Sequence, residues 1–261
     1  MNILITVDME GISGVYHPEQ TREGIRYEEA RRYMTWDINA CVEGCKAAGA
    51  NKIIVRDCHS RGSNVVWSEL SPLIDRVAIG TGLPEKRMPH IEECDAVILL
   101  GYHAMAGTRG GVLEHTWSAS GWQNLWINGK LSGEIALEAC IAGEYGKPII
   151  MVSGDDYACA EARALLPDVV TAEVKKGMSM SGASLLVKEK AHELIRTKAA
   201  EAVKKAGQMK PYKVEAPVKM RLELVERGVL PSKHVMPYME IIDGRTFEVT
   251  ANSVEEGLYR L

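Results

Sequence analysis

The sequence predicts an α/β protein whose central sheet is mostly parallel and flanked by helices, with a smaller α+β part at the C-terminal end. Two observations carry this prediction. Over residues 1–207, short continuous apolar runs alternate with stretches of helical periodicity, as expected for strands that are buried on both faces. Over residues 208–261, apolar and polar side chains alternate with period two, which is typical of antiparallel strands with one solvated face.

Interior parallel strands are predicted from four continuous apolar runs. Each run is followed within two residues by a glycine or an acidic residue, where a loop begins. The runs cover residues 2–7, 52–55, 95–100 and 148–152. Because parallel strands place their carboxyl ends at one edge of a sheet, we expect the residues that follow these runs to converge.

Helices are predicted between and after these strands. The first has apolar residues at spacings of three and four from Ala30 to Cys45, and Gly49 ends it. Ser132 is expected to cap the second, which places Glu134 in its first turn. The predicted helices cover residues 27–48, 133–145, 155–165 and 184–206.

Turn sequences mark the antiparallel strands. Asn128 and Gly129 tolerate the positive φ that a two-residue hairpin turn requires. Asp243 and Gly244 are a second turn signal, which lies within the last predicted strand region. The strands concerned are predicted at residues 124–127, 213–226 and 241–251, and a terminal helix follows them.

Composition narrows the class of protein. The 261 residues carry a formal net charge of -4, so no basic surface for nucleic acid is expected. No apolar run reaches the roughly 20 residues that span a bilayer, and the N-terminal sequence lacks the features of a signal peptide. Six cysteines without a CxxC pair indicate no disulfide framework, and we expect a cytoplasmic protein.

Asp8 and Glu10 follow the first predicted strand and flank Met9. In an extended backbone both carboxylates project to the same side, where they repel each other unless a cation lies between them. The alternative is a solvated loop in which one acid caps a helix. Gly11 and Gly14 favour the metal site, because glycine lets backbone and ligand approach closely.

His59 and His103 each lie just beyond a predicted strand, so both are candidate ligands. Asp57 is expected either to orient the imidazole of His59 or to cap a helix. Cys58 is a candidate soft ligand, although a small buried side chain is preferred. His115 is a candidate acid or base on a loop. The remaining histidines have no comparable setting and are expected to be structural or exposed: His17, His90, His192 and His234.

Glu134 is the fifth candidate ligand, although the helix macrodipole favours an acid in a first turn without any function. The candidates together supply three carboxylates and two imidazoles. Such a set suits Zn²⁺, with Mn²⁺ or Co²⁺ able to substitute, and argues against a structural site built from cysteines. Five ligands exceed the four of a tetrahedral zinc and fit two metals that share a bridging carboxylate. The residues therefore predict a two-metal hydrolase.

Five sequence blocks resemble those of the D-aminopeptidase family, peptidase family M55, and they extend over nearly the whole chain. The blocks are VDMEGISG at residues 7–14, DCHS at 57–60, LGYHA at 100–104, ING with GE at 127–134, and MVSGDD at 151–156. The resemblance implies a dinuclear zinc site with Asp8 as the bridge and Glu10, His59, His103 and Glu134 as the remaining ligands. It also implies a catalytic role for His115, as nucleophile or proton carrier, of which we favour the proton carrier.

The resemblance further implies how the protein assembles. Family members form homodecamers of two stacked pentamers, which enclose the active sites in a chamber that small peptides enter. Cys58 departs from the family pattern, which often has Ser there. No motif marks the residues that would select D-amino acids.

The leading hypothesis is a zinc-dependent aminopeptidase that hydrolyses the N-terminal amide of short peptides containing D-amino acids. Two alternatives stay open at this point. One is another two-metal amidase or a phosphoesterase, for which Arg56, Arg61 and Arg109 are the cationic side chains near the ligand blocks. The other is a ring-forming binding protein that retains a metal for stability.

Overall fold

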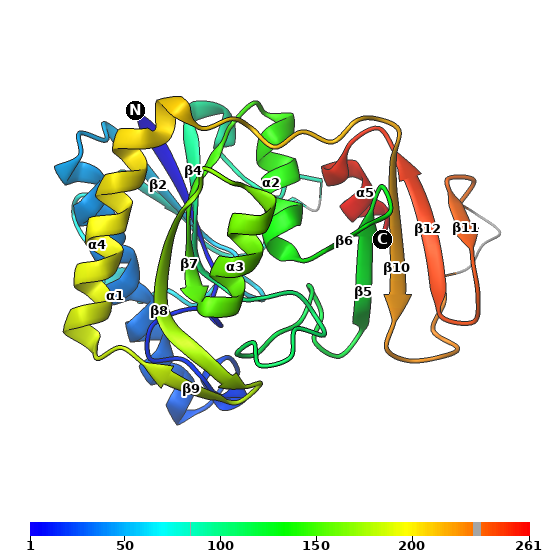
Figure 1. The fold of residues 1–261 in the computed structure, drawn as a ribbon, viewed down its shortest axis with the longest axis horizontal. Coiled ribbons are helices and arrows are strands. Elements are labelled where there is room, and N and C mark those ends of the chain that lie inside the picture. Colours follow the sequence, from blue (N-terminus) through cyan, green and yellow to red (C-terminus); the bar gives the residue numbers. More distant parts are fainter. Residues whose placement is uncertain (84, 232–235) are drawn as a thin grey trace.

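The computed structural model describes residues 1–83, 85–231 and 236–261. Its largest element is a seven-stranded sheet in the order β3-β2-β1-β4-β7-β8-β9 (Figure 1). All its strands run parallel except β9, so the predicted α/β class is confirmed. The strands are β1 Asn2–Val7, β2 Lys52–Asp57, β3 Arg76–Ala78, β4 Ala96–Tyr102, β7 Ile149–Asp155, β8 Val170–Ser179 and β9 Gly182–Leu185.

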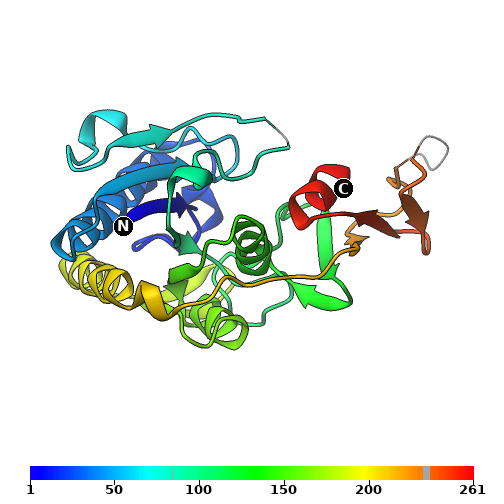
Figure 2. The same ribbon diagram turned by 90° about the horizontal axis from the view of Figure 1, so that it is seen from above.

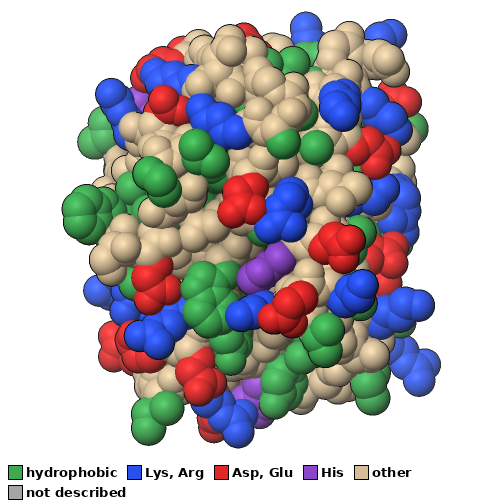
Figure 3. Space-filling view, turned by 90° about the vertical axis from the view of Figure 1, so that its left-hand side faces the viewer, with side chains coloured by type: hydrophobic (Ala, Val, Ile, Leu, Met, Phe, Trp, Pro, Cys, Tyr) green, Lys and Arg blue, Asp and Glu red, His purple; other side chains and the backbone are tan. Residues whose placement is uncertain are grey.

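Helices cover both faces of this sheet. Ile3 and Ile5 of β1 pack with α1 and α4, whereas Leu4 faces the apolar cluster that includes α2 and α3. α1 and α4 lie side by side, and their outer surface carries interspersed acidic and basic side chains (Figure 3). The helices are α1 Ile25–Ala47, α2 Glu134–Glu144, α3 Asp156–Leu165 and α4 Lys188–Lys205, with short 3-10 helices at Pro18–Gln20, Trp67–Glu69, Ile91–Glu93 and Ala206–Gln208.

A second, antiparallel sheet has five strands in the order β11-β12-β10-β5-β6. α2 lies between the two sheets, and one apolar cluster joins them (Figure 2). Asn128 and Gly129, with φ of 46° and 80°, form the predicted hairpin turn between β5 and β6. The elements are β5 Trp122–Ile127, β6 Lys130–Ser132, β10 Val218–Leu224, β11 Met239–Ile241, β12 Thr246–Ala251 and the terminal helix α5 Val254–Arg260.

The second sheet contains strands from both parts of the predicted division into residues 1–207 and 208–261. β10 pairs with β12 on one edge and with β5 on the other. The C-terminal strands are therefore built onto a hairpin from the middle of the chain, and the division itself stays a prediction about domains.

Three element predictions were wrong. The strand expected at residues 213–226 is confined to β10, which begins only at Val218. Ser132 does not cap α2, because it belongs to β6 and its hydroxyl donates to the Lys130 carbonyl; α2 begins after Gly133 without a side-chain cap. The predicted helix at residues 184–206 begins only at Lys188, because Ser184 and Leu185 lie in β9 and pair with β8. Among the described residues, no helix is long and apolar enough to cross a membrane.

Candidate metal centre

Asp8 and Glu10 lie on the loop that leaves the central strand β1. This loop is pressed against β4: the amide of Asp8 donates to the Leu100 carbonyl at 2.9 Å, and that of Gly11 donates to the Gly101 carbonyl at 2.7 Å. A Cβ atom at Gly11 would lie 2.0 Å from the Tyr102 carbonyl oxygen, so only glycine fits. Strand β1 also lies between β2 and β4, whose loops bring in the histidines.

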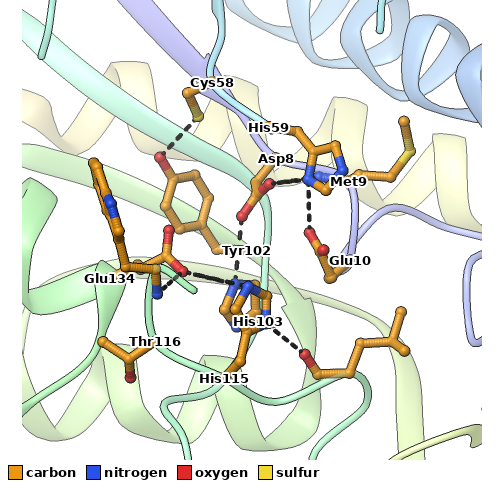
Figure 4. Close-up of polar contacts among 12 residues, drawn as sticks. Asp8, Met9, Glu10, Cys58, His59, Tyr102, His103, His115, Thr116 and Glu134 are labelled. Carbon is orange, nitrogen blue, oxygen red and sulfur yellow. Dashed lines mark hydrogen bonds and ion pairs between the residues drawn. The ribbon is translucent and has the colours of Figure 1, made fainter. Parts of the chain in front are cut away.

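His59, from the loop after β2, faces both acids (Figure 4). Its Nδ1 lies 3.0 Å from Asp8 Oδ1 and 3.1 Å from Glu10 Oε2. Asp57 neither orients this ring nor caps a helix as predicted; its carboxylate accepts from the amides of Asn64 and Val65 and so holds the loop.

His103, from the loop after β4, approaches the other side of Asp8. Its Nε2 lies 3.5 Å from Asp8 Oδ2 and 3.2 Å from Oε1 of Glu134, the first residue of α2. The ring of His115 stacks on that of His103 with centroids 4.0 Å apart, and its Nε2 lies 3.7 Å from Glu134 Oε1 (Figure 4). All six predicted site residues are thus brought together, with Asp8 between two histidine-carboxylate groups.

Each of the three imidazoles has one nitrogen held by a backbone carbonyl. His59 Nε2 lies 3.1 Å from the Thr21 oxygen, His103 Nδ1 3.0 Å from that of Ala104, and His115 Nδ1 2.9 Å from that of Leu113. A carbonyl only accepts hydrogen bonds, so it fixes the proton on that nitrogen. The other nitrogen of each ring, which faces the carboxylates, is then a lone-pair donor in the neutral tautomer, as in metal-binding histidines.

The buried charges perturb one another strongly. Burial disfavours the charged forms, but the adjacent imidazoles of His103 and His59 hold the pKa of Asp8 well below its usual value. Burial likewise opposes protonation of His59 and His103, yet the neighbouring carboxylates raise the pKa of both imidazoles well above the usual value. The cluster therefore attracts positive charge, which either protons or metal ions can supply.

The donor set fits a metal. None of the five predicted ligands is more than 9% exposed, and Glu10 Oε2 and His103 Nε2 have no hydrogen-bond partner among the described residues. Ligand atoms gather within 4.8 Å of one another in two overlapping groups, one of Asp8, Glu10 and His103 and one of His103, His115 and Glu134. Cys58 is not suited to the site, because its thiol donates to the Val7 carbonyl and burial raises its pKa well above the usual value.

Two cavities open beside this cluster. The larger, of about 520 Å³, is lined by Glu10, Thr21, His59, His115 and Met180 among others. The smaller, of about 260 Å³, lies on the side of Asp8 and Glu134. A small substrate can therefore reach the carboxylates and histidines from outside.

Comparison with known proteins decides the family. The family model Peptidase_M55, described as D-aminopeptidase, matches residues 1–261. The chain belongs to this family. It is 34% identical over 248 residues to a D-aminopeptidase of Bacillus subtilis (strain 168), a match that covers 94% of this chain and 89% of that protein.

A solved structure agrees with the M55 assignment. The chain is similar to the Zn-dependent D-aminopeptidase DppA from Bacillus subtilis, described as a self-compartmentalizing protease, with a TM-score of 0.90 and 32% sequence identity. The match covers 100% of this chain and 94% of that one. The resemblance drawn from the five sequence blocks is therefore confirmed, and so is the fold.

Two charged residues beside the site of this M55 peptidase were not predicted from its sequence. Lys175 of β8 is buried, and its ammonium donates to the carbonyls of Glu10, Ile12 and Val15 at 2.6, 2.8 and 2.5 Å. Arg87 lines the smaller cavity and donates to the buried Glu138. Neither Lys175 nor Arg87 follows a predicted strand. The spacing of apolar residues in a sequence also does not show whether a lysine or arginine is buried or exposed to solvent.

The other histidines are outside the cluster. His17 accepts from the Glu19 amide at the start of a 3-10 helix, His90 pairs with Glu93, and His192 lies 3.3 Å from Asp37. These settings agree with the expected structural roles, whereas His234 lies outside the described residues.

Proposed function

We propose that this M55 peptidase is a zinc-dependent aminopeptidase that hydrolyses the N-terminal amide of short peptides with D-amino acids at their N-terminus. The observation that carries the proposal is the meeting of Asp8, Glu10, His59, His103 and Glu134 in one buried cluster beside two cavities. The zinc dependence and D-aminopeptidase activity of the similar Bacillus subtilis proteins support it.

Two zinc ions per subunit would use these ligands completely, with Mn²⁺ or Co²⁺ able to substitute. Glu10 and His59 would hold one ion, His103 and Glu134 the other, and Asp8 would bridge, because its two oxygens face different histidines. Bound zinc supplies Lewis acidity that polarises a carbonyl and makes water acidic near neutral pH.

His115 is proposed to carry the proton to the leaving amine. Its Nδ1 is held by the Leu113 carbonyl, so Nε2 is the nitrogen that exchanges protons on the cavity side. Its side chain is 16% exposed, against 1% for His103, so substrate can reach it. An imidazole suits this step because its ordinary pKa lies close to neutral pH.

We further propose a cytoplasmic homodecamer of two stacked pentamers. The self-compartmentalizing character of the similar DppA structure supports a closed assembly. Six free, buried cysteines are compatible with a reducing compartment.

The test is an assay of purified, zinc-loaded protein with the amides and dipeptides of D-Ala and L-Ala. We expect release of D-Ala, which Glu10→Gln and His103→Ala abolish, whereas Glu29→Gln on the exposed surface of α1 leaves it unchanged. If the Glu10→Gln and His103→Ala variants release D-Ala as fast as the wild type, the proposed site is wrong. If the wild type releases L-Ala as fast as D-Ala, the proposed D-selectivity is wrong.

The same preparation separates the remaining alternatives. Hydrolysis of p-nitrophenyl phosphate in place of the peptides would favour a phosphoesterase. One tightly held ion with no hydrolysis of either substrate would favour a metal-stabilised binding protein.

A further inference from the structure

Arg87 presents a guanidinium group to the smaller cavity beside the candidate metal centre. This cavity, of about 260 Å³, is also lined by Asp8, Glu134, His115 and Trp117. The Arg87 side chain is 15% exposed, so it is mostly enclosed yet reaches the cavity. Among the described residues that line the cavity, it is the one arginine or lysine, and it shares the lining with the carboxylates of Asp8 and Glu134.

The Arg87 group is held rigidly on two sides. Its Nε donates to Oε1 of Glu138 at 2.7 Å, and the same oxygen accepts from the Tyr102 hydroxyl at 3.3 Å. Its guanidinium carbon lies 4.6 Å from the centroid of the Trp117 ring. The amide of Trp117 in turn donates to Glu134 Oε1 at 2.8 Å, so Arg87 is packed against the residues of the site itself.

Glu138 accepts a hydrogen bond from only one of the three guanidinium nitrogens of Arg87, Nε. Among the described residues, neither terminal nitrogen of Arg87 has a hydrogen-bond partner, and neither is fully buried. Burial disfavours the cation, but Glu138 raises the pKa of Arg87 well above its usual value, so the group stays charged. A charged fork with free N–H groups in a small cavity matches the planar geometry of a carboxylate.

We propose that Arg87 binds the C-terminal carboxylate of a dipeptide substrate. The proposal rests on the proposed aminopeptidase function. With the scissile carbonyl at Asp8 and Glu134, a dipeptide has one residue beyond that bond, and an extended residue spans roughly 3.5 Å. Its carboxylate would then meet Arg87 within the same cavity, where three nearby acids, Asp8, Glu134 and Glu138, would otherwise repel it.

Substrates that differ only in this carboxylate provide the test. The zinc-loaded, full-length protein is assayed with D-Ala-D-Ala, with the same dipeptide as its C-terminal amide, and with D-Ala p-nitroanilide, which has no carboxylate. We expect kcat/KM of the wild type to favour the acid over the amide by about 10- to 100-fold, as for hydrogen bonds to a charged group.

Arg87→Gln is expected to remove this preference, mainly through KM of the acid, and to change kcat/KM for the amide and the anilide less than threefold. Arg76→Gln, on the exposed edge strand β3, is the matched control and should keep the preference. Arg87→Gln leaves Glu138 without its partner, so Arg87→Gln with Glu138→Gln is measured beside it, and thermal unfolding is recorded for every variant.

Three outcomes would overturn the role of Arg87. They are equal kcat/KM of the wild type for acid and amide, an equal fall for all three substrates in the Arg87 variants, and a preference that survives in the double variant. Failure of the aminopeptidase proposal looks different, because the wild type would then release no p-nitroaniline from D-Ala p-nitroanilide.

Discussion

At the scale of single residues, the site is defined by which nitrogen of each imidazole carries the proton. Backbone carbonyls fix this proton away from the carboxylates in His59, His103 and His115. A lone pair that faces a carboxylate is repelled unless a cation lies between them. Under the proposed function, the same arrangement would serve ligation in the first two histidines and proton transfer in the third.

His115→Ala separates these two roles. If His115 carries a proton, zinc content should stay at the wild-type value while kcat falls by about 10²- to 10⁴-fold, the usual contribution of general acid-base catalysis. Zinc content is measured by atomic absorption, and kcat with D-Ala p-nitroanilide. His103→Ala is the comparison, and it should lose metal together with activity. Loss of metal from both variants would make His115 a ligand.

Some residues of the site could be predicted from the sequence, and others could not. Asp8, His59 and His103 could be predicted because each follows a recognisable strand, and the sheet brings strand ends together. Glu134 was the least secure of the candidates, since any helix favours an acid in its first turn, and the family resemblance strengthened it. Arg87 and Lys175 were missed because their partners, Glu138 and three backbone carbonyls, are distant in sequence.

At the scale of elements, β8 supports the loop that carries Glu10. Lys175 reaches from this strand to three carbonyls between residues 10 and 15, and burial lowers its pKa to about 8. These carbonyls would otherwise be short of partners in the interior. The loop therefore depends on a strand that is not its sequence neighbour.

Lys175→Met is expected to lower the free energy of unfolding by about 3 kcal/mol, because it leaves buried carbonyls without a donor. It should also weaken zinc binding, because Glu10 is no longer held in place. Lys176→Met is the control, since Lys176 is the next residue of β8 and is exposed. Guanidinium unfolding curves and zinc titrations measure both effects. Equal stability of the two variants would contradict a supporting role for Lys175.

Whether a strand could be predicted from the sequence depended on how deeply both of its faces are buried. β1, β4 and β7 are buried on both faces and have continuous apolar sequences, which leave little ambiguity. β8 includes charged residues from Glu173 to Lys176, and β3 has only three residues at the sheet edge. Such strands owe their structure to neighbours that a local pattern does not reveal.

At the scale of the whole molecule, α2 joins the two sheets through one apolar cluster. Cys140 of α2 lies within this cluster and is 2% exposed. Burial raises its pKa to about 12, and it raises the pKa of Cys159 in α3 to about 12 as well. Their thiols are protonated and inaccessible as long as the sheets stay packed on these helices.

Thiol labelling therefore reports whether this packing persists in solution. We expect 5,5′-dithiobis(2-nitrobenzoic acid) at pH 8 to modify none of the six buried cysteines of the native protein within minutes, and all six in guanidinium. Glu29→Cys, on the exposed surface of α1, should add one fast-reacting thiol. Rapid native labelling of Cys140 would show that the second sheet separates from α2.

The pairing of β5 with β10 has a consequence for biosynthesis. Chains emerge from the ribosome N-terminal end first, and the ligand-bearing loops are all complete by residue 134. The hairpin of β5 and β6, which lies between His115 and Glu134, nevertheless gains its pairing partner only when residues 218–224 have been made. A nascent chain thus holds every proposed zinc ligand well before it can fix their positions, and peptidase activity should begin only after β10 has been made.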